Sequence, residues 1–406
     1  MSAAAPVVIV GGGPAGMVAG LLLARAGVRV TVLEKHADFL RDFRGDTVHP
    51  STLELFNEIG LLEELLKEPH AAIDTMTLNL LGQRYTIATM KHLPVAARFV
   101  AMMPQWDLLD FIAGQGKRYP TFDLRMSTEA TGLTYDTAGR ASGVTLASGE
   151  TLPARLVIAA DGRRSVLRVS AELPLEDLGA PMDVLWFRIP VPAGMDMSDI
   201  ALGTIDKGGM VVAIPRGDYW QCAQIIEKVG FAPIEAQGIA AFRDRIVAIV
   251  PGLAAGIDAI QSFDEVKLLS VALDRLTRWS RPGLLAIGDA AHAMSPVGGV
   301  GINLAVQDAV ATANILAAPL AAGADPDPLL ARVQERRWTP TTRMQAIQRF
   351  AHQRVIEPML RGEITRVPLA VRLLDAIPLL RRIPGRVLGL GFGRQHVQSP
   401  LAREFP

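Results

Sequence analysis

The chain has 406 residues, half of them hydrophobic and a fifth charged, which is typical of a compact globular protein with more than one domain. Its 41 basic and 41 acidic residues balance, so the charge gives no reason to expect a nucleic acid as partner. The single cysteine, Cys222, excludes an internal disulfide and enzymes that work through a pair of thiols, and the seven histidines show no spacing typical of metal ligands.

The N-terminal stretch VVIVGGGPAGMVAGLLLARAGVRVTVLEK has the order strand, glycine-rich turn, helix, strand and acid. Val7–Val10 is an apolar run typical of a buried parallel strand. Gly11, Gly13 and Gly16 then form the pattern G-x-G-x-x-G, and Glu34 ends the second strand. Glycines let the backbone approach a pyrophosphate at the start of the helix, and an acid at this position accepts hydrogen bonds from ribose hydroxyls. The stretch predicts a dinucleotide site, and both NAD and FAD fit it.

Two later stretches also end an apolar strand in an acid next to glycine. They are LVIAADGRRSVLR, which contains Asp161, and LLAIGDAAHAMSPVGGVGIN, which contains Asp289. Ligands of parallel sheets collect at the carboxyl ends of the strands, so we expect Asp289 at such a site. Three glycines within residues 298–301 precede a segment of helical composition from Ile302.

The three motifs together resemble the single-component FAD monooxygenases typified by p-hydroxybenzoate hydroxylase, and the resemblance covers nearly the whole chain. It implies an α/β fold in which a Rossmann-like FAD-binding domain carries an inserted antiparallel β-sheet that binds substrate. It also implies hydroxylation of an aromatic or other apolar small molecule, with O2 and NADPH or NADH, through a flavin C4a-hydroperoxide.

The same resemblance suggests roles for individual residues. Asp289 matches an acid that binds the ribityl chain of FAD, and Gln105 matches a glutamine that contacts the cofactor. Arg44 matches an arginine that reaches the pyrophosphate and helps to hold the nicotinamide donor. The expected cofactor-binding residues are Gly11, Gly13, Pro14, Ala15, Gly16, Glu34, Lys35, Arg44, Gln105, Asp161, Asp289, Gly299, Val300, Gly301, Ile302 and Asn303.

The helix from Ile302 would point its N-terminus at the pyrimidine edge of the flavin, where a reduced ring carries negative charge. Pro296 matches a family proline near the ring. His49 is a further candidate near the flavin, and an ordinary loop histidine is the alternative. Arg44, Pro296 and His49 are therefore the expected catalytic residues, and no metal is expected.

Alternating and β-branched patterns predict strands in residues 71–97 and 179–277. We expect one antiparallel sheet with an apolar face over the flavin. Trp186, Met210 and Trp220 are candidates for the substrate pocket, although packing in the ordinary core is the interpretation we favour for each. The expected FAD-binding domain comprises residues 1–70, 98–178 and 278–327, the substrate domain comprises 71–97 and 179–277, and a C-terminal helical segment comprises 328–406.

The tail is helical, basic and apolar from about residue 364. Docking on the FAD-binding domain is one interpretation, and peripheral contact with a membrane is another. The N-terminus lacks a leader pattern, and no uninterrupted apolar run of about 18 residues is present, so we expect a cytoplasmic protein without a membrane span. A monomer and a homodimer both stay open.

Three functions remain after the resemblance is weighed. The first is the monooxygenase, and the second is a related flavin-dependent reductase or halogenase. The halogenase motif W-x-W-x-I-P is absent, because LWFRIP has one tryptophan. The third is a non-catalytic binder of apolar ligands, which the intact Asp289 and the glycine-rich loop disfavour.

Overall fold

The computed structural model describes residues 5–40, 47–196 and 200–402. Its central sheet has the strand order β20 (Ser280–Arg281), β21 (Leu284–Ala286), β12 (Leu156–Ala159), β1 (Val7–Val10), β2 (Val30–Leu33) and β8 (Phe122–Arg125). The strands from β21 to β8 run parallel, and β20 is antiparallel at the edge. Every residue of β21, β12, β1 and β2 is buried, which explains the unbroken apolar runs of the first three; β2 contains the buried Thr31.

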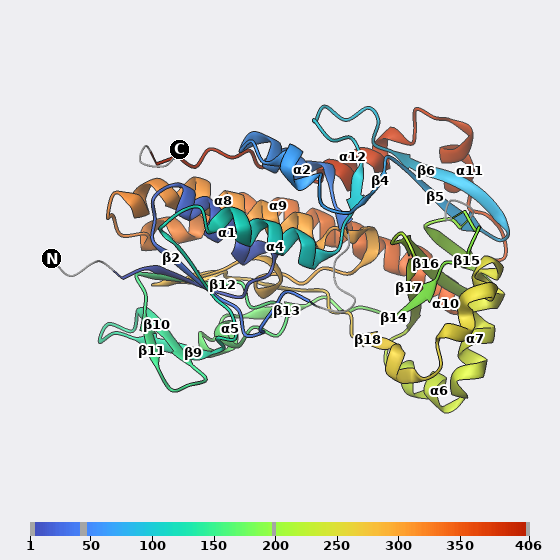
Figure 1. Ribbon diagram of the computed structural model, residues 1–406, viewed down its shortest axis with the longest axis horizontal. Coiled ribbons are helices and arrows are strands. Elements are labelled where there is room, and N and C mark those ends of the chain that lie inside the picture. Colours follow the sequence, from blue (N-terminus) through green and yellow to red (C-terminus); the bar gives the residue numbers. More distant parts are fainter. Residues whose placement is uncertain (1–4, 41–46, 197–199, 403–406) are drawn as a thin grey trace.

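A layer of helices covers one face of this sheet (Figure 1). It contains α1 (Pro14–Arg25), α4 (Gln105–Gly116), α8 (Gly301–Ala321) and α9 (Asp327–Ala351), and α8 packs against both α1 and α9. A small antiparallel sheet of β9 (Ala130–Tyr135), β10 (Ala141–Leu146) and β11 (Thr151–Pro153) packs against β12. This Rossmann-like arrangement confirms the predicted fold class.

The α8 helix is the central helix of the fold. Residues Val297–Ala321 are long and apolar enough to cross a bilayer by length and composition, but 72% of the stretch that passes this test is buried inside the protein. Shorter helices complete the first half of the chain, namely α2 (Pro50–Glu58), α3 (Leu62–Leu65) and α5 (Val166–Ser170).

A second sheet combines the two predicted insertions (Figure 1). Its order is β18 (Lys267–Leu269), β14 (Met182–Pro190), β17 (Tyr219–Glu227), β16 (Gly209–Pro215), β15 (Gly203–Asp206), β5 (Thr75–Leu80) and β6 (Gln83–Thr89). The expectation of a wholly antiparallel sheet was wrong in one place, because β5 and β15 pair in parallel. That pair joins the two insertions, while α6 (Phe231–Ala236) and α7 (Gly238–Ile249) belong to the apolar cluster on one face.

Two small sheets lie outside these two. In one, β7 (Val100–Met102) pairs with both β3 (Thr47–Val48) and β4 (Ala71–Ile73). In the other, β13 (Leu175–Asp177) pairs with β19 (Asp274–Leu276). Since β4 belongs to the expected substrate domain and β3 and β7 to the FAD-binding domain, the pairing crosses the predicted boundary. The domain limits stay a prediction.

The C-terminal segment divides between the two sheets. Leu330 and Val333 of α9 belong to the same apolar core as β1. A π-helical turn (His352–Ile356) leads into α10 (Glu357–Leu360), α11 (Leu369–Ala376) and α12 (Arg382–Leu390). Both α11 and α12 pack against β6 rather than against the central sheet. The expected docking on the FAD-binding domain therefore holds for α9, in part for α12, which also packs against α2, and for the last described residues, where the N–H of Ala402 donates to the carbonyl of Arg25 at 3.0 Å.

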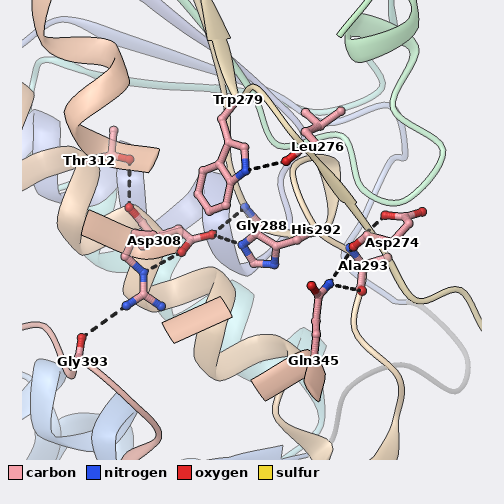
Figure 2. Close-up of polar contacts among 11 residues, drawn as sticks. Asp274, Leu276, Trp279, Gly288, His292, Ala293, Asp308, Thr312, Gln345 and Gly393 are labelled. Atoms are coloured by element: carbon pink, nitrogen blue, oxygen red, sulfur yellow. Dashed lines mark hydrogen bonds and ion pairs between the residues drawn. The ribbon is translucent and has the colours of Figure 1, made fainter. Parts of the chain in front are cut away.

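A buried carboxylate connects α8, α9 and the turn after β21 (Figure 2). One oxygen of Asp308 accepts hydrogen bonds from the backbone N–H of Gly288 at 3.1 Å and from Nε2 of His292 at 2.6 Å. The other oxygen accepts from Nε of Arg337 at 2.8 Å. Burial pushes the pKa of Asp308 upward, but the charges and hydrogen bonds of His292 and Arg337 outweigh burial and hold the pKa below its ordinary value of 3.8.

Two glutamines of α9 hold the rest of the loop that follows β21. Gln345 donates from Nε2 to the carbonyl of Ala293 at 3.4 Å. Gln348 accepts from the N–H of Ser295 at 3.1 Å, and its Nε2 donates to the carbonyl of Val297 at 3.0 Å. One face of α9 therefore fixes the backbone of residues 293–297.

Replacing Asp308 by Asn should lower the free energy of unfolding by about 3–5 kcal/mol at neutral pH, because Arg337 would stay buried without a charged partner. Since the folded pKa lies below 3.8, the unfolded chain takes up a proton first as the pH falls. The difference between the two proteins should therefore shrink below about pH 4. Urea unfolding over a pH series measures it.

The exposed Asp244 on α7 supplies the matched control, and Asp244→Asn should change stability by less than about 0.5 kcal/mol. An Asp308→Asn protein as stable as the wild type at neutral pH would show that the buried carboxylate does not hold these elements together.

Candidate active site

The carboxyl ends of β1, β2, β12 and β21 lie side by side at one edge of the central sheet. The pairing aligns Val10 with Leu33 and with Ala159, and Ala159 with Ala286. The residues that follow these strands are therefore brought together. They include the predicted residues Gly11, Glu34, Asp161 and Asp289.

The three glycines of the N-terminal turn differ in what a side chain at their position would meet. Gly11 has a φ of +110°, and a Cβ there would lie 2.2 Å from the carbonyl oxygen of Ala160. A Cβ on Gly16 would lie 2.0 Å from the carbonyl oxygen of Gly11. A Cβ on Gly13 would meet nothing within 4 Å. The fold thus requires Gly11 and Gly16, whereas Gly13 leaves open space where a pyrophosphate can approach the start of α1.

Glu34 lies beside this turn. Its Oε2 accepts from the N–H of Gly12 at 3.0 Å, and its Oε1 accepts from the N–H of His36 at 3.1 Å. These bonds hold the carboxylate at the end of β2, where the ribose of a dinucleotide is expected. The neighbouring Lys35 is exposed. Pro14 begins α1 and Ala15 is buried in it.

Two further carboxylates have acceptor oxygens that the described residues leave unused. Oδ2 of Asp161 accepts from the N–H of Leu167 at 3.3 Å, whereas its Oδ1 is buried and has no hydrogen-bond partner there. Burial raises the pKa of Asp161, although a hydrogen bond from Ser165 opposes the shift. The half-buried Asp289 makes no side-chain hydrogen bond or ion pair within the described part of the chain. Acceptors of this kind suit the hydroxyls of a ligand.

The glycine-rich loop before α8 is held from the side by residues near β3. A Cβ on Gly299, which has a φ of +63°, would lie 2.5 Å from Oγ1 of Thr47. The carbonyl of Gly299 accepts from Thr47 Oγ1 at 2.7 Å and is 3.0 Å from Nε2 of His49. Burial lowers the pKa of His49, so a neutral imidazole donates this bond. His49 is therefore buried, and its ring points toward the glycine-rich loop before α8.

The start of α8 is fixed by α2. Oδ1 of Asn303 accepts from Ser51 Oγ at 2.7 Å and from Thr52 Oγ1 at 2.8 Å. Gly301 is the first residue of α8, Val300 precedes it, and Ile302 is buried behind it. The N–H groups of this first helical turn have no partner inside the helix, so they can bind negative charge.

The remaining expected residues are placed as follows. Pro296 is half-buried and begins the turn that leads to Gly299. Gln105 is the first residue of α4. Arg44 lies outside the described residues. The roles of these residues stay predictions.

The two faces of the second sheet separate the pocket candidates. Trp186 and Met210 pack in one apolar cluster with Val297 of the loop before α8. Trp220 lies in a different cluster, with Phe187 and the α7 side chains, on the opposite face. Trp220 pairs with Ile189, an odd number of residues from Trp186 along β14, so the two indoles point to opposite faces of the sheet. The place of Trp220 in the substrate pocket stays a prediction. Nε1 of Trp186 is buried without a hydrogen-bond partner among the described residues.

Three residues that shape this site were not predicted, namely Thr47, Thr52 and Asp308. Nothing in the local sequence marks the two threonines, because their partners lie about 250 positions away. Asp308 had a usable signal, since an acid within the apolar helix INLAVQDAVATANIL indicates a buried partner.

Comparison with known proteins adds to this geometry. Residues 4–347 match the family model described as FAD binding domain. The chain is 31% identical to a 6-methylpretetramide 4-monooxygenase of Streptomyces rimosus, over 98% of this chain and 95% of that protein. It is 28% identical to a rifampicin monooxygenase of Streptomyces venezuelae, over 75% of this chain and 62% of that protein.

Among solved structures, Pseudomonas aeruginosa PqsL in complex with 2-aminobenzoylacetate superposes with a TM-score of 0.75 at 20% identity, covering 89% of this chain and all of that one. This likeness concerns the fold. The matches agree with the open space at Gly13 and with the carboxylate oxygens of Asp161 and Asp289 that no described residue uses. The chain therefore belongs to the FAD binding domain family, and it is a flavoprotein oxidoreductase of the monooxygenase type.

Proposed function

We propose that this protein uses NADPH or NADH and O2 to hydroxylate an apolar aromatic small molecule. One observation carries the proposal. The edge of the central sheet that gathers Gly13, Asp161 and Asp289 leads through the loop before α8 to the apolar cluster of Trp186. A cofactor site and an apolar face for a substrate are thus connected by a single loop.

The residues of the chain would divide the work of holding FAD. The start of α1 and the open space at Gly13 suit the pyrophosphate, and Glu34 suits the ribose. Asp289 offers acceptors to the ribityl hydroxyls, and the start of α8 offers N–H groups to negative charge on the ring. Bound FAD would supply the redox chemistry, namely acceptance of electrons from a nicotinamide and activation of O2.

The apolar side chains around the loop would keep water away from the reacting centre. Val297 packs with Trp186 and Met210, and the backbone of the loop is tied to Gln348 on one side and to Thr47 on the other. Exclusion of water favours oxygen transfer over release of hydrogen peroxide. A rigid loop is therefore part of the proposed function, not only of the fold.

The substrate class follows from the same cluster. Its walls are apolar and aromatic, and Nε1 of Trp186 is a buried donor without a partner among the described residues. An aromatic compound with one hydrogen-bond acceptor satisfies both features. The similar proteins support this class, since one is named for 6-methylpretetramide and the PqsL structure holds 2-aminobenzoylacetate.

The reaction itself can be tested with 18O2. Aromatic compounds are screened for those that accelerate the oxidation of NADPH or NADH by the FAD-loaded protein. The masses of the products are then measured by mass spectrometry. We expect an accelerating compound to gain one labelled oxygen atom. Acceleration without incorporation by any compound would favour the reductase, and a halogenated product would favour the halogenase. A protein that binds such compounds but oxidises neither nucleotide would be a non-catalytic binder.

The roles of the glycines lead to a paired prediction. Gly13→Val should leave the stability of the FAD-free protein almost unchanged, because the side chain enters open space. It should weaken FAD binding by roughly ten- to 100-fold, the equivalent of one charge-assisted hydrogen bond. Gly16→Val should instead destabilise the FAD-free protein, because its Cβ would meet the backbone of Gly11.

Thermal unfolding without FAD and fluorescence titration with FAD separate the two effects. Equal loss of stability in both variants would mean that Gly13 serves the fold and that the pyrophosphate assignment is wrong.

Trp186→Phe should raise KM for the hydroxylated compound by about three- to tenfold, because one neutral hydrogen bond is lost. The FAD content and kcat should stay near their wild-type values. Trp220→Phe is the matched control, since Trp220 is buried on the opposite face, and it should lower stability without changing KM. An unchanged KM in Trp186→Phe would remove the indole N–H from substrate binding.

A further inference from the structure

Large apolar side chains are exposed along the two C-terminal helices. We define the C-terminal strip as Leu369, Leu373, Ile377, Leu379 and Ile383. Leu369, Leu379 and Ile383 are 68%, 64% and 65% exposed. Isolated exposed apolar residues are normal, but a contiguous group indicates a contact surface.

The strip is the outward face of a firmly docked segment. Leu369, Leu373 and Ile377 recur at intervals of four residues, so they share one side of α11 and its end. On the inward side, Val371 packs against the apolar cluster of the second sheet. The exposed side of α11 therefore consists of apolar residues, with the exposed Arg372 next to them.

Polar contacts with the edge strand β6 fix this orientation. Oδ1 of Asp375 accepts from the N–H of Thr86 at 2.8 Å, and the carbonyl of Arg381 accepts from the N–H of Thr89 at 3.2 Å. A Cβ on Gly385 would lie 1.9 Å from the carbonyl oxygen of Thr89, so α12 lies directly on this strand. The strip cannot turn inward without breaking these contacts.

Positive charge surrounds the strip. Residues 361–390 contain six arginines and two acids, Glu363 and Asp375, and no lysine. Four of the arginines are exposed and form no ion pair within the described part of the chain, namely Arg366, Arg372, Arg382 and Arg386. A neutral protein therefore has a local surface that is both apolar and basic.

A surface that is both apolar and basic favours one kind of binding partner. A second copy of the chain, related by a twofold axis, would bring the arginines of one strip against those of the other. An anionic lipid surface instead accepts the apolar side chains at its interface and pairs its headgroups with the arginines. We propose that α11 and α12 dock the protein on an anionic lipid bilayer.

The proposed docking would bring the lipid surface close to the apolar cluster of Trp186. Val371, on the inward side of α11, belongs to the same cluster as Trp186 and Met210. One helix thus separates the lipid-facing strip from the apolar face of the second sheet. The docking does not depend on the reaction proposed above, and its failure would leave that reaction untouched.

Flotation with vesicles tests the docking, using the FAD-loaded full chain. Wild-type protein should float with vesicles of phosphatidylcholine and phosphatidylglycerol in equal parts, and much less with phosphatidylcholine alone. The Leu379→Glu/Ile383→Glu variant should stay in the bottom fraction with both. The Arg372→Gln/Arg382→Gln/Arg386→Gln variant should bind the anionic vesicles about 100-fold more weakly at low salt, since each arginine near such a surface contributes about fivefold.

Val169→Glu is the matched control, because Val169 on α5 is 73% exposed and lies outside the C-terminal helices. It should float like the wild type. Wild-type protein that stays in the bottom fraction with anionic vesicles would overturn the proposal. So would equal loss of flotation in Val169→Glu. The strip would belong to a second copy of the chain if three results coincide. The wild type binds no vesicles, light scattering shows it to be a dimer, and Ile383→Glu converts it to a monomer.

Discussion

The buried carboxylate of Asp308 is the contact on which the site depends. It binds the backbone of Gly288, and it pairs with His292 and Arg337 in a region without solvent. Burying a charge costs several kcal/mol unless its partners are well placed, so this cluster defines one arrangement of α8, α9 and the turn after β21. That turn carries Asp289, and α8 begins at the glycine-rich loop. The position of both ends of the expected flavin site thus follows from one acid in an apolar helix.

Some residues of the site fix its walls, and others leave space or polar atoms free for a ligand. Gly11, Gly16 and Gly299 are glycines because backbone or Thr47 occupies the space of a side chain. Gly13 is a glycine although that space is open. The carboxylates of Asp161 and Asp289 likewise keep acceptors that no described residue uses. A site for a large cofactor needs both properties, because the walls must be fixed while the contacting groups stay free.

The sequence predicted the local parts of the fold well and the distant contacts poorly. The order strand, glycine turn, helix and acid identified the dinucleotide site because all its parts lie within one βαβ unit. The parallel pairing of β5 with β15 could not be foreseen, since it joins residues 75–80 to residues 203–206. The sequence also grouped Trp186 and Trp220 as pocket candidates although they lie on opposite faces of the second sheet, because the strand pattern does not say which face meets the loop before α8. The support of Gly299 by Thr47 depends on the folded chain as well.

A crystal structure of the FAD complex is the most direct measurement of the central claim, which is that one edge of the central sheet holds the cofactor and the Trp186 face covers its ring. The account predicts the pyrophosphate over Gly13 and a ribityl hydroxyl within hydrogen-bond distance of Asp289. It also predicts the ring between the loop of residues 296–301 and the Trp186 side of the second sheet. A ring bound on the Trp220 side, or a ribityl chain without contact to Asp289, would contradict it.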